Sequence, residues 1–105
     1  MNVTLEYDYL RELFATGATT NKKHRFQPQI IKGYQKVIRI LLNSLKIEDL
    51  WKFKSLHYEV LIGDKKGKSS VKINDQYRLE FEVIQNNEDV LLTVCNILEI
   101  SNHYK

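Results

Sequence analysis

Residues 69–81 read Ser-Ser-Val-Lys-Ile-Asn-Asp-Gln-Tyr-Arg-Leu-Glu-Phe, and this stretch decides the fold. Apolar and polar side chains alternate on both sides of a short polar centre at residues 74–76. Alternation with a period of two is typical of strands that bury one face. A three-residue loop would pair Ile73 with Tyr77 and keep both on the apolar face. The stretch therefore predicts an antiparallel hairpin in which Arg78 points to the opposite face.

A final strand is predicted at residues 90–100, after a turn at residues 86–89. In an ideal strand one face would carry Val90, Leu92, Val94, Leu98 and Ile100. Glu99 and Ser101 would lie on the other face, together with His103 if the extended conformation continues. His103 would then share a face with Arg78, whereas Tyr104 would point the opposite way unless the terminus bends. Leu91 and Ile97 make both faces apolar for part of the strand.

The first half of the chain predicts a short strand at residues 2–7 and two helices. The first helix spans residues 8–16, and Gly17 offers a left-handed end. Pro28 suits the first position of the second helix. Apolar residues then recur at helical spacing and form a predicted core stripe: Ile30, Ile31, Tyr34, Val37, Ile38, Leu41, Leu42 and Leu45. Trp51 and Phe53 are expected to pack rather than to stack on a base.

Length and composition predict a single domain over residues 1–105. No N-terminal stretch resembles a signal peptide, and the longest apolar run is too short to span a bilayer, so the cytoplasm is the expected location and no membrane contact is expected. The single cysteine, Cys95, excludes an internal disulfide and the usual zinc spacings, so we expect no metal and no cofactor. Cys95 itself is interpreted as a packed small hydrophobe.

Charge is distributed unevenly along the chain, whose formal net charge is +3. Residues 13–47 contain no Asp or Glu, yet they contain seven basic residues: Lys22, Lys23, Arg25, Lys32, Lys36, Arg39 and Lys46. A second basic group consists of Lys65, Lys66, Lys68 and Lys72. Such clusters attract phosphate backbones or an acidic protein partner, although each lysine alone is typical of an ordinary solvated surface. The acid-free stretch favours a polyanionic ligand.

The chain ends in Ser-Asn-His-Tyr-Lys, residues 101–105, which concentrate groups that transfer protons or bind phosphate. Histidine has an unperturbed pKa near neutrality and therefore suits proton transfer. If the final strand pairs with the strand that carries Arg78, a histidine, a tyrosine and an arginine meet on one sheet. That combination is the skeleton of a metal-free ribonuclease. His24 and His57 lack recognisable partners and are interpreted as structural or exposed.

Three segments together resemble the RelE/HigB toxins, which are also called plasmid-maintenance killer proteins. They are residues 61–67 (Leu-Ile-Gly-Asp-Lys-Lys-Gly), the hairpin at residues 69–81, and residues 97–105. The resemblance implies an α+β, RelE-like fold over nearly the whole chain. In that fold a short N-terminal strand and two helices pack on one face of a small, mainly antiparallel, twisted sheet. The C-terminal strand ends at the active site.

The resemblance implies the toxin component of a type II toxin–antitoxin pair, acting as a ribosome-dependent, metal-free mRNA endoribonuclease that blocks translation. A HigA-like antitoxin with a helix-turn-helix domain would neutralise it, and DNA would be reached only through that antitoxin. Arg78 matches the arginine that holds the phosphate, while His103 and Tyr104 match the C-terminal proton-transfer and stacking positions. The expected RNA contacts are Lys65, Lys66, Lys68, Lys72, Asn74, Asn102 and Lys105.

The chain departs from better-known members at several of these positions. Those members end in Asp-Tyr-His, whereas this chain has Asn102-His103-Tyr104. Ile62 stands where they have a lysine, and Asn74 stands where some have an arginine. Two other functions fit the same fold: a ParE-like toxin that binds DNA gyrase, and a catalytically inactive basic nucleic-acid-binding module. The His-Tyr pair favours the nuclease over the gyrase binder.

Overall fold

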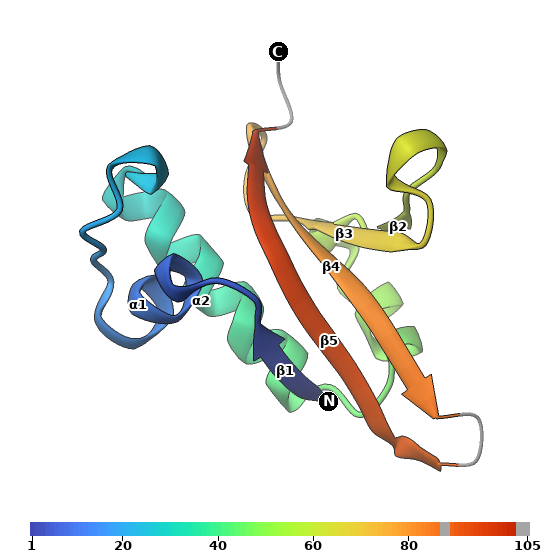
Figure 1. Cartoon of the computed structure of the whole chain (residues 1–105). Coiled ribbons are helices and arrows are strands. Elements are labelled where there is room, and N and C mark those ends of the chain that lie inside the picture. The colour runs from blue at the N-terminus through green and yellow to red at the C-terminus, as the bar shows by residue number, and fades with distance from the viewer. Residues whose placement is uncertain (87–88, 103–105) are drawn as a thin grey trace.

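A five-stranded sheet forms the centre of the molecule, with its strands in the order β1-β5-β4-β3-β2 (Figure 1). The computed structural model describes residues 1–86 and 89–102. The strands are β1 (Asn2–Leu5), β2 (Glu59–Val60), β3 (Lys68–Lys72), β4 (Tyr77–Asn86) and β5 (Asp89–Asn102). β1 runs parallel to β5, and the other neighbouring strands are antiparallel. The predicted α+β class and the mainly antiparallel sheet are confirmed.

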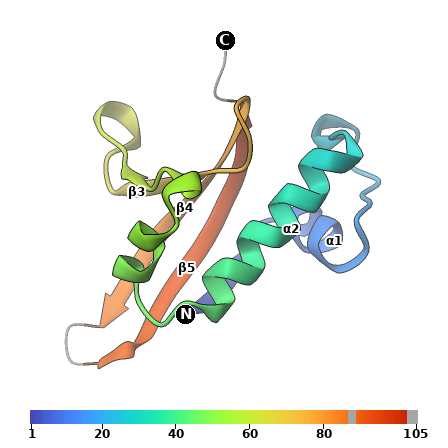
Figure 2. The ribbon, with the colours of Figure 1, turned by 180° about the vertical axis from the view of Figure 1, so that it is seen from behind.

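Within the described residues, two α-helices and four short 3-10 helices accompany the sheet. They are α1 (Asp8–Thr16), η1 (Lys22–His24), α2 (Pro28–Asn43), η2 (Ile47–Lys52), η3 (Lys54–Leu56) and η4 (Gly63–Lys65). Gly17 ends α1 at a φ of 77°, and Pro28 opens α2, as the sequence predicts. Seen from behind, α2 and the η2–η3 segment lie on the same side of the strands (Figure 2). The opposite side of the sheet is not covered by these elements.

The core lies between α1, α2 and the covered face of the sheet. Tyr34 and Phe81 are its largest fully buried side chains. The Tyr34 hydroxyl donates a 2.9 Å hydrogen bond to the carbonyl of Leu10 and so ties α2 to α1. Gly33 lets α2 approach the hairpin closely, because a Cβ there would lie 2.9 Å from Cγ2 of Ile73. These contacts fix the position of the helices on the sheet.

Part of the predicted core is exposed instead. Leu42 and Leu45 are 45% and 69% exposed, and Trp51 and Phe53 are 61% and 44% exposed. α2 ends at Asn43, so Leu45 no longer follows the helical period of the stripe. Leu42 is one residue from Leu41, and a step of one turns a side chain about 100° around a helix, away from the buried face.

The hairpin forms as predicted. The backbone N–H of Ile73 donates to the carbonyl of Tyr77 at 2.9 Å, and the next residues outward, Lys72 and Arg78, are paired. The Asn74 side-chain oxygen accepts hydrogen bonds from the N–H groups of Gln76 and Tyr77 at 2.8 and 2.7 Å. The loop therefore satisfies its own backbone donors through Asn74.

The predicted register of the last strand is wrong along part of its length. Glu80 pairs with Glu99 and Phe81 pairs with Ile97, so Leu98 is an extra residue in β5. Such a bulge exchanges the two faces of a strand on either side of it. Cys95 and Ile97 are therefore buried together with Ile100, whereas Val94 and Leu98 are only partly buried. The side chains of Val90 and Leu92 lie outside the described part of the structure.

Candidate functional site

The side of the sheet away from α1 and α2 carries mostly polar residues, and we call it the open face. The register places three rows of side chains across it. One row is Glu59, Ser70, Glu80 and Glu99; the second is Lys72, Arg78 and Ser101; the third is Lys68, Glu82 and Asn96. The expectation that Arg78 points away from the helices is confirmed, and Ser101 is its neighbour on β5.

Arg78 is held on the open face by three contacts. Its Nε donates to Oγ of Ser70 at 2.9 Å, and its Nη2 donates to the carbonyl of His57 at 2.7 Å. Nη2 also lies 3.4 Å from Oε1 of Glu59. The Arg78 side chain is only 11% exposed, so its guanidinium is largely immobilised. Nη1 makes no hydrogen bond to the residues that the structure describes, and it remains a donor for an incoming anion.

His57 contributes its backbone rather than its imidazole. Among the described residues other than glycine, His57 alone has a positive φ, of 45°. This left-handed conformation ends η3. The conformation costs energy for a residue with a Cβ, so the fold must hold it in place. Its carbonyl then accepts the hydrogen bond from Arg78. The side chain of His57 is exposed, which is one of the two alternatives that the sequence left open.

His24 has a structural role. Its ring stacks on that of Tyr9, with centroids 3.6 Å apart and an interplanar angle of 6°. Burial raises the pKa of Tyr9 to about 12, so its hydroxyl stays protonated at neutral pH. The interpretation of His24 as structural therefore agrees with its packing, and the pair anchors the basic loop between α1 and α2.

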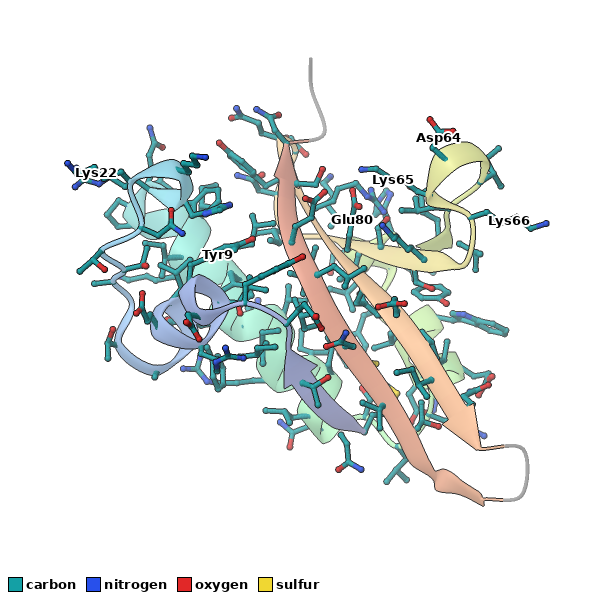
Figure 3. All side chains as sticks on the ribbon, in the orientation of Figure 1. Tyr9, Lys22, Asp64, Lys65, Lys66 and Glu80 are labelled. Carbon is teal, nitrogen blue, oxygen red and sulfur yellow. The ribbon has the colours of Figure 1, made fainter. Side chains whose placement is uncertain are left out.

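Lys65 is bound to acidic residues of the open face. Its Nζ lies 2.7 Å from Oε2 of Glu80 and 3.7 Å from Oε1 of Glu99. Figure 3 shows Lys65 and Glu80 pointing toward one another from η4 and β4, whereas Lys66 points away from the sheet. The Glu80 side chain is only 8% exposed. Its hydrogen bond raises the pKa of Lys65 above the ordinary value of that amine.

The other predicted RNA contacts are placed differently from one another. Lys72 pairs with Asp75 at 2.7 Å, and Lys68 lies opposite Glu82 at the start of β3. The side-chain oxygen of Asn74 already accepts two backbone hydrogen bonds within the hairpin loop. Asn102 pairs with Tyr77 and alternates with Ser101, so it lies on the opposite face from Arg78. His103, Tyr104 and Lys105 lie outside the described residues.

Sequence reasoning missed Glu59 and the carbonyl of His57. Glu59 is half exposed. Among the described residues, it is the one whose carboxylate lies within 4 Å of the Arg78 guanidinium. A lone glutamate in a two-residue strand carries no pattern that marks it as functional. Its proximity to Arg78 arises because β3 brings the two together, with Ser70 between them.

Neither a metal cluster nor a reactive thiol is found in the described residues. No group of three His, Cys, Asp or Glu side chains there could hold a metal ion. Cys95 is buried, as predicted, and burial raises the pKa of its thiol to about 11, which keeps it protonated. Within the same residues, every helix is too short or too polar to cross a bilayer.

Comparison with known proteins decides the family. A family model described as the RelE-like toxin of the type II toxin–antitoxin system HigB matches residues 4–97. The chain belongs to this HigB-like toxin family. It is therefore the toxin of a type II toxin–antitoxin pair, and the family implies an antitoxin partner. The match ends before residues 98–105, which include the C-terminal histidine and tyrosine.

A solved structure shares the fold of this HigB-like toxin. It is described as a YoeB/ParE toxin from Agrobacterium tumefaciens, and the superposition has a TM-score of 0.55. It covers 99% of this chain and 100% of the other, with 14% sequence identity. Identity this low shows a common fold and says nothing of activity. No curated protein sequence matches the chain.

Proposed function

We propose that this HigB-like toxin is a ribosome-dependent mRNA endoribonuclease of the cytoplasm, neutralised by a HigA-like antitoxin. The observation that supports the proposal most directly is the pairing of Arg78 with Glu59 on the open face. It puts a fixed phosphate-binding cation within 3.4 Å of a half-exposed carboxylate. An arginine suits phosphate because its donors form a rigid planar fork.

The reaction is an internal transesterification of RNA. The 2′-oxygen forms a bond to phosphorus as its proton leaves to a base, and the bond from phosphorus to the 5′-oxygen then breaks. The 5′-oxygen receives a proton from an acid. The products are a 2′,3′-cyclic phosphate and a free 5′-hydroxyl. The step thus requires one base, one acid and a cation for the negative charge that develops on the phosphorane.

The residues of the open face suit these roles. Arg78 would bind the phosphorane oxygens through Nη1, while Ser70 and His57 continue to hold Nε and Nη2. Glu59 would accept the 2′-hydroxyl proton, a role that Asn102 cannot fill because an amide is not a base. His103 would protonate the 5′-oxygen, with Tyr104 as a second donor or a stacking group, on the pattern of the family. The remaining basic residues would guide the message.

The experiment is induced expression followed by mapping of mRNA 5′ ends, with cleavage of a short message on purified ribosomes. Glu59→Gln should lower the single-turnover rate roughly 10²–10⁴-fold, and Arg78→Lys roughly 10²–10³-fold. Glu82→Gln is the matched control, because Glu82 is an exposed carboxylate of the same face. Deletion of residues 103–105 should also relieve toxicity. Intact messages combined with DNA damage would sink the nuclease proposal and point to gyrase.

A further inference from the structure

A groove lies between the C-terminal half of α2 and the segment that follows it, away from the open face. Its volume is about 630 Å³, and its walls come from α2, η2 and Phe53. Leu45 and Phe53 give it an apolar surface, and each is substantially exposed. Phe53 also lines an adjoining pocket together with Trp51, so the apolar surface continues along η2. Leu42 near the end of α2 is exposed as well, but it lines neither the groove nor the adjoining pocket.

The rim of this groove is positively charged. Lys36 and Arg39 project from the exposed side of α2. Lys52 of η2 also lines the rim, but its Nζ lies 3.8 Å from the Asp49 carboxylate, so the unpaired cations of the rim are Lys36 and Arg39. Neither Lys36 nor Arg39 forms an ion pair with any described residue. The acid among the lining residues is Asp49, whose carboxylate is already engaged. It accepts the N–H groups of Leu45 and Lys46 at 2.9 and 3.2 Å, and these bonds hold the pKa of Asp49 below its usual value.

An apolar floor with a cationic rim selects an occupant by its chemistry. Single-stranded RNA would satisfy the cations, but its sugar–phosphate backbone would leave Leu45 and Phe53 without apolar partners. An amphipathic peptide segment with acidic residues beside its apolar face satisfies both surfaces at once. We infer that the α2–η2 groove binds an acidic, amphipathic segment of the antitoxin. This inference rests on the proposed pairing with an antitoxin, and it is independent of whether the toxin cleaves RNA.

The inference is tested by calorimetric titration of the toxin with separately purified cognate antitoxin. Leu45→Glu places a charge on the apolar surface, and the pair Lys36→Glu and Arg39→Glu reverses the rim. All three side chains are exposed, so the fold should survive, and circular dichroism checks it. Ile62→Glu is the matched apolar control, because Ile62 is 86% exposed and lies outside the groove. Lys66→Glu is the charge control.

Each groove variant should raise Kd for the antitoxin at least tenfold, whereas the two controls should stay within twofold of the parent. Raising NaCl from 0.1 to 0.5 M should weaken the parent complex more than the complex of the rim variant. Salt screens the attraction of Lys36 and Arg39 for the antitoxin, and the rim variant lacks these two cations. In cells, the groove variants should stay toxic when the antitoxin is co-expressed. The inference is overturned if the groove variants bind antitoxin like the parent, or if they lose affinity only for a 20-nucleotide single-stranded RNA. If the groove variants lose antitoxin binding while the parent toxin leaves messages intact, the groove inference stands and only the nuclease proposal is refuted.

Discussion

The ion pair between Lys65 and Glu80 offers a quantitative test of how the open face is held together. Lys65→Met would leave the Glu80 carboxylate without its cation, although that side chain is only 8% exposed. An unsatisfied buried group costs about 1–3 kcal/mol. Lys65 itself is 45% exposed, so water can partly replace it, and we expect about 1–2 kcal/mol of lost stability. Glu80→Gln keeps an acceptor for Lys65 and should cost about 0.5–1 kcal/mol.

The assay is urea unfolding at pH 7 for the parent, both single variants and the double variant. The coupling energy of the cycle should be about 1 kcal/mol, and Lys66→Met should be close to neutral because Lys66 is exposed and points away from the sheet. The pKa of Lys65 is raised above 10.5, and a raised pKa means that the charged form is stabilised in the folded state. Its contribution is therefore complete below about pH 10.5 and is lost as pH rises further.

Two results would refute this reasoning. A coupling energy indistinguishable from zero would mean that Lys65 does not contact Glu80 in solution. A difference between the parent and Lys65→Met that changes between pH 7 and pH 9 would mean that another group carries the effect. The same variants separate a structural role of Lys65 from RNA contact. If Lys65 binds phosphate, Glu80→Gln removes the negative charge that competes for Lys65 and tightens RNA binding, whereas Lys65→Met weakens it.

Three further predictions concern the supports of the site. Gly33→Ala should destabilise the protein despite the higher helix propensity of alanine, because its Cβ would lie 2.9 Å from the branched side chain of Ile73. In an Ile73→Ala background the same change should stabilise by up to about 1 kcal/mol, as thermal unfolding would show. Tyr34→Phe removes the buried hydrogen bond to Leu10 and should cost about 1–2 kcal/mol in urea unfolding. Asp49→Asn should lower stability at pH 7, because backbone N–H bonds hold the pKa of Asp49 below its ordinary 3.8; this difference should disappear as pH falls through that range.

The sequence predicted the elements whose signals are local. The helix boundaries at Gly17 and Pro28 follow from backbone preferences of single residues, and the hairpin follows from alternation around residues 74–76. The bulge at Leu98 could not be predicted in the same way. Apolar residues occupy both faces of the last strand, so either register would bury a comparable surface. The choice is made by the partner strand, where Phe81 must face the core beside Ile97.

The candidate site was predictable only in part, for a related reason. Side chains alternate between the two faces along the hairpin, and this alternation alone places Arg78 on the open face. The contacts that orient Arg78 are made by His57 and Glu59, which lie about 20 residues earlier in the chain. They depend on a left-handed backbone at His57, and no residue type there signals that conformation. Long-range side-chain pairs of this kind are fixed by tertiary structure.

The pairing of cations on the open face gives a physical reason to expect the proposed nuclease to depend on the ribosome. Five basic residues on or beside this face are candidates for RNA contacts, but Lys65, Lys72 and Arg78 already contact carboxylates. RNA that displaces those carboxylates exchanges one anion for another and gains little Coulomb energy. Only Lys66 and Lys68 have no ion pair within the described residues.

Counterion release therefore gives a measurable distinction. With single-stranded RNA, five free cations would give a slope of log K against log salt of about −3.5, and two would give about −1.4. We expect the shallower slope, weak binding of free RNA, and cleavage only where the ribosome holds the message in place, since positioning can replace binding energy in lowering a barrier. A slope near −3.5 in a filter-binding titration would show that RNA breaks these lysine and arginine ion pairs with no loss of binding free energy. The argument for ribosome dependence from charge pairing would then fail.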